Sequence, residues 1–175
     1  VHNPRQCHTT KNWSRDLSLY QLGFGGRGMG YRDSSQDVLG AMPNMPNEAI
    51  ELVQKILSVQ KRDGSGMHQF YPLTMEASVG DAHEGHDRPK YYGDDHLWPV
   101  FSVSAYLRET GDFSLLEKVL PFYDKDQDGK AIESATVYEH LKRAIEFTEK
   151  NKGRHGVPLL GFADWNDTVN LPTGA

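Results

Sequence analysis

Residues 46–57 have the sequence Pro-Asn-Glu-Ala-Ile-Glu-Leu-Val-Gln-Lys-Ile-Leu, and they carry the clearest periodic pattern of the chain. The apolar residues recur on one stripe at helical spacing, and polar residues separate them: Ala49, Ile50, Val53, Ile56 and Leu57. This period predicts an amphipathic α-helix that buries one face. Pro46 suits the first turn of such a helix, and the turn-rich residues 61–66 follow its end.

Outward from this helix, other segments also predict helices. A short one is expected at about residues 34–41, a largely buried one at 97–110, a short one at 113–120 and an amphipathic one at 137–151. Gly111 is the expected terminator of the second of these. No segment shows the alternation of a strand. We therefore expect an all-α fold of paired helices with long functional loops between them.

The composition restricts the class of protein. The 175 residues match about one domain, and the net charge of −5 without a Lys/Arg-rich run argues against a nucleic-acid partner. Cys7 is the only cysteine, so an intrachain disulfide and a cysteine metal cluster are excluded and a reducing, cytoplasmic location is expected. No run of about 18 apolar residues predicts a membrane span.

Both ends of the sequence have the character of an interior segment. Val1 stands where an initiator methionine would, and Ala175 closes a Leu-Pro-Thr-Gly-Ala stretch that directly follows a polar motif. We expect residues 1–175 to be one partial domain of a larger protein, truncated at both ends.

A glycine-rich loop at residues 23–30 precedes a polar motif that includes Arg27, Arg32 and Asp33. Glycines allow the backbone to approach a ligand closely. An arginine can hold phosphate through two parallel hydrogen bonds, and an Arg–Asp pair can hold neighbouring sugar hydroxyls. A salt bridge and a carboxylate at a helix start would use the same residues. Composition alone leaves both interpretations open.

A second polar motif, Gly-Phe-Ala-Asp-Trp-Asn-Asp, occupies residues 161–167 and places Asp164 and Asp167 around Trp165. An aromatic ring can stack on a sugar face, and its apolar surroundings raise the pKa of a neighbouring carboxylic acid so that it can donate a proton. An Asx-turn with a packed tryptophan is the alternative. The residues alone do not decide between them.

Two segments resemble metal sites but lack the full pattern. Residues 83–87, with His96 further on, contain histidines without the helical spacing of a zinc site. Residues 124–129 resemble the start of a calcium loop, but Ala135 stands where a bidentate Glu is needed. We therefore expect a solvated polar loop and a solvent-facing turn, and no metal.

Taken in order, five segments resemble glycoside hydrolase family 94, a family of inverting sugar phosphorylases. They cover nearly the whole chain, from about residue 13 to 171, and the motifs that carry the resemblance lie at 26–37, 63–74, 94–98, 106–112 and 155–167. The resemblance implies part, about half, of an (α/α)₆ barrel. It also implies that further phosphate-binding elements lie beyond Ala175, so activity is expected of the whole protein and not of the isolated chain.

The resemblance also assigns roles to residues. Asp167 matches the general acid and Trp165 a stacking residue beside it. The remaining matches are Arg32 and Asp33 with residues that hold the donor sugar, Gln36 and Asp37 with supporting residues, and Arg27 with a phosphate-binding arginine.

The implied reaction is the phosphorolysis of a β-linked disaccharide or oligosaccharide, with inversion, to an α-sugar 1-phosphate. Inorganic phosphate is the co-substrate and no cofactor is expected; a homodimer of the full-length protein is left open. Two alternatives stay open: an inverting hydrolase on the same barrel, which would need a second carboxylate, and a non-catalytic carbohydrate-binding fragment.

Overall fold

The computed structural model describes residues 28–83 and 89–164. Four α-helices dominate this part: α2 (Tyr31–Ala41), α3 (Pro46–Leu57), α4 (Trp98–Thr110) and α5 (Val137–Lys150). Five strands of two or three residues accompany them: β1 (Met29–Gly30), β2 (Gln69–Phe70), β3 (Ala77–Ser78), β4 (Val119–Pro121) and β5 (Ser134–Thr136). Short 3₁₀ segments complete it: η1 (Gly80–His83), η2 (Asp95–Leu97) and η3 (Phe113–Glu117).

Helix α3 supplies much of the core. Pro46 lies in its first turn, and its buried face consists of Ala49, Ile50, Leu52, Val53, Ile56 and Leu57. Val53 and Ile56 have no exposed surface. The helix and the apolar stripe predicted from residues 46–57 are therefore confirmed.

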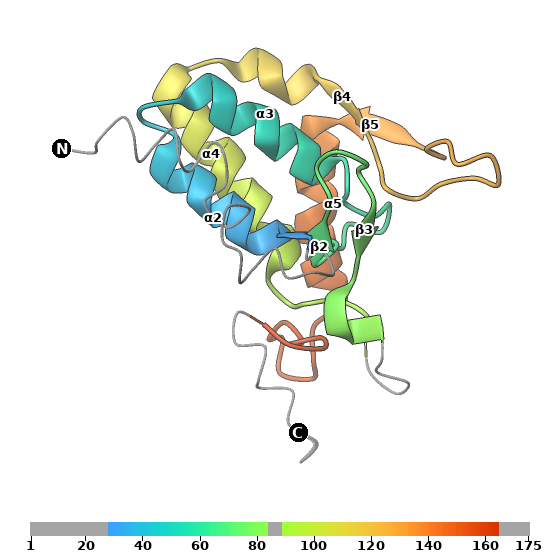
Figure 1. Ribbon diagram of the computed structural model, residues 1–175. Helices are drawn as coiled ribbons and strands as arrows, with labels where there is room; N and C mark the ends of the chain where they lie inside the picture. The colour runs from blue at the N-terminus through green and yellow to red at the C-terminus, as the bar shows by residue number, and fades with distance from the viewer. Residues whose placement is uncertain (1–27, 84–88, 165–175) are drawn as a thin grey trace, which may run out of the picture.

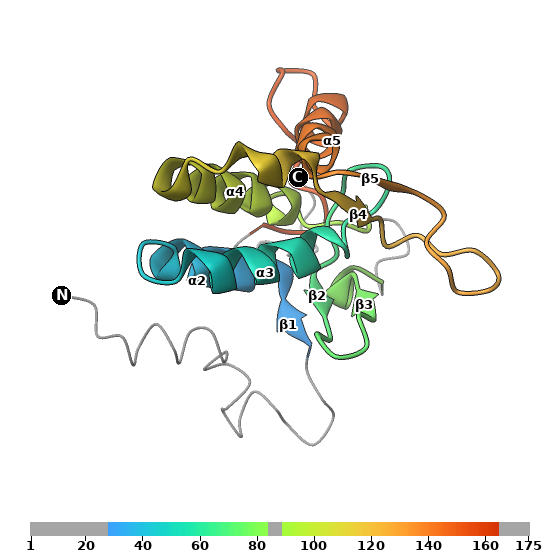
Figure 2. The same ribbon diagram turned by 90° about the horizontal axis from the view of Figure 1, so that it is seen from above.

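The helices α2, α3 and α4 form one packed group. The turn at residues 42–45 joins α2 to α3, and α4 packs against both of them. Seen from above in Figure 2, α4 lies between the α2–α3 pair and α5. The described part is thus largely helical, as expected, and its paired helices are consistent with part of a helical barrel.

A small sheet lies at the N-terminal end of α2 (Figure 1). Its order is β1-β2-β3, with antiparallel pairing of Met29 to Phe70 and of Phe70 to Ala77. The expectation of no strands was wrong, because strands of two or three residues are too short to show alternation and their pairing is decided by distant segments. This sheet ties the start of α2 to residues 68–70.

The start of α2 shows the effect of that tie. The helix begins at Tyr31 and not near Ser34 as predicted, and the backbone N–H of Tyr31 donates to the carbonyl oxygen of His68 at 2.9 Å. The long-range contact fixes the entry of the chain, so the helix starts one turn earlier than its own sequence indicates.

The remaining helix ends follow local rules. Gly111 ends α4 in a left-handed conformation with φ of 68°, as predicted. Thr136 caps α5, since its hydroxyl accepts a hydrogen bond from the N–H of Glu139 at 3.2 Å. The helix predicted over 113–120 is only the short η3, because the chain then extends into β4, which pairs with β5.

The charged segment at residues 124–129 is a turn, as predicted. One carboxylate oxygen of Asp126 accepts from the backbone N–H groups of Asp128 and Lys130, each at 2.9 Å. Within the described part, no helix combines the length and the apolar character that a membrane crossing requires.

Candidate functional site

Arg32 lies in the first turn of α2 with its side chain only 7% exposed. Its Nη1 donates to Oδ1 of Asp94 at 3.1 Å and lies 3.8 Å from Oδ1 of Asp95. The other oxygen of Asp94 accepts from Nε1 of Trp98 at 2.9 Å. The short segment before α4 therefore supplies two carboxylates that hold the guanidinium in place.

Asp95 is the most buried charged group of this arrangement, with 1% of its side chain exposed. Its Oδ2 lies 2.9 Å from Nδ1 of His68. Burial raises the pKa of Asp95 to about 6, and the neighbouring His68 and Arg32 oppose that rise. We refer to Arg32, His68, Asp94 and Asp95 as the Arg32 cluster.

Tyr31 is fully buried next to this cluster. Burial and the charge of Asp95 both raise the pKa of its hydroxyl. The Tyr31 hydroxyl is thus a neutral group that borders the cluster, and it adds no charge.

The other predicted residues of α2 lie outside the cluster. Asp33, Gln36 and Asp37 have partly exposed side chains, and their spacing places them on one face of the helix. Gly30 makes room for Asp33, because a Cβ there would lie 2.8 Å from its Oδ2. Arg32 therefore points toward Asp94 and Asp95, whereas Asp33, Gln36 and Asp37 keep partly exposed side chains on α2.

Residues 161–163 return to the same end of the molecule. The N–H of Phe162 donates to the carbonyl of Tyr91, and the N–H of Gly93 donates to that of Ala163, both at 2.8 Å. Gly161 is required here, since its φ is 73° and a Cβ would lie 2.5 Å from the oxygen of Tyr91. The pairing places Phe162 and Ala163, which directly precede Asp164, beside residues 91–93. Arg27, Trp165 and Asp167 lie outside the described residues.

A row of aromatic rings connects this return segment to the Arg32 cluster. His68 and Tyr92 are stacked, with ring centroids 3.6 Å apart and planes inclined by 12°. The ring of Tyr92 in turn lies beside that of Phe162, with the ring centroids 5.5 Å apart. The segment that leads into the predicted acid is therefore packed through Tyr92 against His68.

His96 does not belong to a solvated loop. It is buried, its Nε2 lies 2.7 Å from the hydroxyl of Thr148, and burial lowers its pKa to about 4. The solvated loop was predicted for residues 83–87, of which 84–87 lie outside the described residues, whereas His96 is held inside the protein by its contact with Thr148 of α5. In the described ranges, no group of three or more His, Cys, Asp or Glu side chains is arranged to hold a metal ion.

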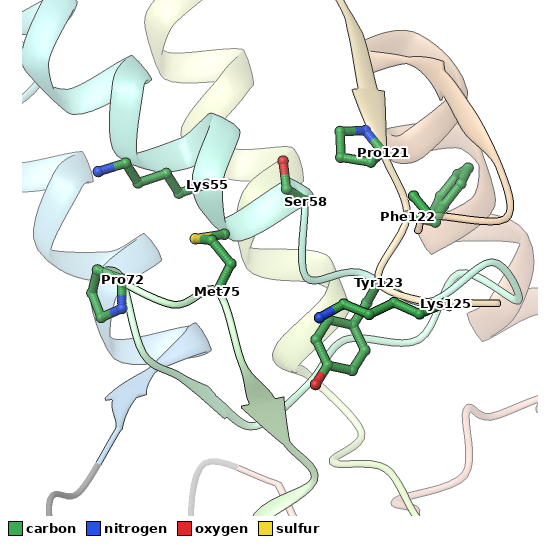
Figure 3. Close-up of a pocket in the computed structure, with 9 residues that line it drawn as sticks. Lys55, Ser58, Pro72, Met75, Pro121, Phe122, Tyr123 and Lys125 are labelled. Carbon is green, nitrogen blue, oxygen red and sulfur yellow. The ribbon is translucent and has the colours of Figure 1, made fainter. Parts of the chain in front are cut away.

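A separate hollow lies near the end of α3 (Figure 3). Its volume is about 370 Å³, and it is lined by Lys55, Ser58, Pro72, Met75, Pro121, Phe122, Tyr123, Lys125 and Ala131. The hydroxyl of Tyr123 is already used, because it bonds to both backbone groups of Ala77. None of these lining residues is a predicted site residue or a carboxylate, so we place the candidate site at the Arg32 cluster.

A sequence comparison matches residues 1–175 to the catalytic domain of the glycosyl hydrolase 94 superfamily. The chain belongs to this family. The membership confirms the family inferred from the five sequence segments, and it makes the Arg32 cluster part of a family 94 catalytic domain.

Curated relatives in family 94 include several phosphorylases. The chain is 32% identical to N,N'-diacetylchitobiose phosphorylase of Vibrio furnissii, over 97% of the chain and 22% of that protein. It is 29% identical to solabiose phosphorylase of Paenibacillus borealis, over 93% and 19% respectively. A cyclic β-(1,2)-glucan synthase of Rhizobium meliloti is 28% identical over 81% of the chain and 5% of the synthase. The chain thus spans about a fifth of the two phosphorylases.

Three residues of the Arg32 cluster were not individual candidates in the sequence: His68, Asp94 and Asp95. They were noted only within segments resembling the family, because nothing local distinguishes a buried carboxylate from a solvated one. The one local indication was the accumulation of His, Asp and Tyr in a stretch without helical period.

The raised pKa of Asp95 predicts a pH-dependent effect on stability. Its unfolded value is about 3.9, so the folded value of about 6 is the higher one. Ionised Asp95 therefore costs folding free energy: its contribution is most favourable below about pH 4 and is lost as the pH rises through about 6. Asparagine does not titrate, so the free energy of unfolding of Asp95→Asn should rise relative to that of the wild type as the pH increases from 4 to 7. The expected rise is on the order of 2–3 kcal/mol.

Denaturant unfolding of both proteins at several pH values measures this difference. The comparison cancels the titration of all other groups. A wild-type-to-variant difference that stays constant from pH 4 to 7 would contradict the prediction.

Proposed function

We propose that the whole protein catalyses the inverting phosphorolysis of a β-linked disaccharide or oligosaccharide. The observation that carries the proposal is the membership of family 94, whose matched relatives include phosphorylases named for disaccharides and oligosaccharides. The buried Arg32 cluster, packed through Tyr92 against the segment leading to Asp167, supports the location of the site.

In the proposed reaction, a phosphate oxygen attacks the anomeric carbon from the face opposite the leaving group. The new carbon–oxygen bond forms as the glycosidic bond breaks, and Asp167 gives its proton to the departing sugar oxygen. The products are an α-sugar 1-phosphate and the shortened sugar. An inverting hydrolase needs a second carboxylate to activate water, whereas phosphate is already an anion and needs a cationic site instead.

The proposed residue roles rest on the resemblance of the sequence motifs to family 94. We propose that Arg32 and Asp33 hold the donor sugar, that Trp165 stacks beside Asp167, and that Arg27 contacts the phosphate. Gln36 and Asp37 share a face of α2 with Asp33 and would support it. A cytoplasmic location would supply both sugar and phosphate, and the step as written uses no cofactor.

The dependence on phosphate tests the proposal directly. Full-length protein is incubated with a panel of β-linked disaccharides, with and without phosphate, and the products are followed by phosphorus and proton NMR. We expect sugar 1-phosphate of the α configuration only when phosphate is present. Free sugar formed equally without phosphate would indicate a hydrolase, and binding without any turnover would indicate a carbohydrate-binding protein.

A further inference from the structure

His68 is held on three sides by the surrounding protein. Its Nδ1 contacts the buried carboxylate of Asp95 at 2.9 Å, and one ring face lies on Tyr92 with a centroid distance of 3.6 Å. Its Cδ2 edge lies against Gly80, where a Cβ would approach to 2.6 Å. The orientation of the imidazole is therefore fixed by packing and by Asp95.

The remaining edge of this ring is open. The side chain is 20% exposed although the Asp95 side chain is only 1% exposed. Nε2 of His68 does not belong to the buried polar side-chain atoms without a partner in the described ranges, so this nitrogen lies on the exposed part of the ring. Within the described ranges, Nε2 of His68 makes no hydrogen bond, whereas Nδ1 is bonded to Asp95.

His140 shows how a structural histidine of the same chain differs. It is fully buried, and its ring nitrogens lie 2.8 Å from Oε1 of Gln60 and 3.2 Å from the carbonyl of Leu120. Both nitrogens are used inside the core. In His68 only one nitrogen is used, and the other faces outward with its position fixed.

The location of His68 relates this open nitrogen to the candidate site. The two oxygens of the Asp95 carboxylate face Arg32 and His68 respectively. On its other side, His68 is connected through Tyr92 to Phe162 in the segment that precedes Asp167. His68 therefore lies between the arginine proposed to hold the sugar and the segment of the proposed acid.

We propose that His68 is a further sugar-binding residue of this site, whose Nε2 accepts a hydrogen bond from a hydroxyl of the sugar that Arg32 helps to hold. When Nδ1–H donates to the Asp95 carboxylate, the neutral imidazole presents an acceptor at Nε2. Asp95 is then a positioning residue, because its Oδ2 holds Nδ1 of His68 at 2.9 Å while its Oδ1 lies within ion-pair distance of Arg32, at 3.8 Å. The inference rests on the proposed function.

Two substitutions separate binding from a structural role. His68→Asn keeps a donor near the Nδ1 position, toward Asp95, but removes the group at Nε2. His68→Gln places an amide oxygen near the Nε2 position but gives up the contact with Asp95. Both are made in the full-length protein, and KM for the best β-disaccharide, KM for phosphate and the unfolding temperature are measured.

We expect His68→Asn to raise KM for the sugar about fivefold to tenfold, with KM for phosphate and the unfolding temperature little changed. His68→Gln should raise KM for the sugar by a smaller factor than His68→Asn does. A set of deoxy sugars then identifies the hydroxyl. The analogue that lacks it should bind the wild type more weakly than the parent sugar does, but should bind His68→Asn as well as the parent sugar does.

An unchanged sugar KM in His68→Asn, or a rise in His68→Gln at least as large as in His68→Asn, would overturn the proposal in an active enzyme. That second pattern would mean that only the contact with Asp95 matters. A wild-type protein that phosphorolyses no disaccharide would overturn the proposed function and this inference with it, so the two failures are distinguishable.

Discussion

Asp167→Asn is expected to lower the rate of phosphorolysis by at least about 10³-fold, within the range of 10²–10⁴ that general acid catalysis contributes. Asparagine has nearly the same shape but no acidic proton, so the leaving sugar would depart as an alkoxide. Sugar binding should persist, because the side-chain volume is kept. The rate of sugar 1-phosphate release by the full-length protein measures the effect.

Two comparisons make this prediction specific. Asp164→Asn, at the neighbouring acid of the same motif, should retain far more activity. A substrate with an acidic phenol as leaving group needs no proton, so its phosphorolysis should survive in Asp167→Asn. A larger loss of activity in Asp164→Asn than in Asp167→Asn would assign the role of general acid to Asp164.

Arg32→Lys is expected to lower kcat/KM for the sugar roughly 10- to 100-fold, with little effect on KM for phosphate. Lysine keeps one positive charge but loses the planar fork that Asp94 aligns at 3.1 Å. Arg32→Ala should in addition destabilise the fold by on the order of 3 kcal/mol, because it leaves the carboxylates of Asp94 and Asp95 without their cation. Steady-state kinetics and denaturant unfolding measure the two effects.

Lys125→Ala is the matched control for the loss of a cation. Lys125 is exposed at the rim of the hollow in Figure 3, with its Nζ 5.3 Å from the centre of the Tyr123 ring. It should change the sugar kinetics by less than about twofold. Arg27→Ala should instead raise KM for phosphate. An Arg32→Lys variant that keeps the wild-type kcat/KM for the sugar would limit Arg32 to a structural role.

Much of the helical framework could be predicted from local patterns. The stripe in residues 46–57, Pro46 in the first turn and Gly111 after α4 are properties of neighbouring residues, and the structure confirms each of them. The strands could not be predicted in this way, since β1 and β2 consist of two residues each and are defined by their pairing. For the same reason, the start of α2 depends on a hydrogen bond that the backbone N–H of Tyr31 donates to the carbonyl oxygen of His68.

The same distinction between local pattern and long-range contact applies to the candidate site. Its motifs were visible in sequence because Arg32, Asp33 and the acids at 164 and 167 stand in short ordered segments that resemble family 94. The partners of Arg32 were not visible, because Asp94 is 62 residues away along the chain. The burial that separates Asp95 from the exposed acids is likewise a property of packing.

By itself, the sequence determined the family, the helical character and the residue types available for binding sugar and phosphate, because these depend on composition, period and the order of motifs. The tertiary structure decided that Arg32 faces Asp94 and Asp95, that Asp95 also holds His68, and that residues 161–163 pair with residues 91–93. Contacts between distant segments arise only when the chain packs, and burial changes the pKa of a carboxylate such as Asp95 only in that packed state.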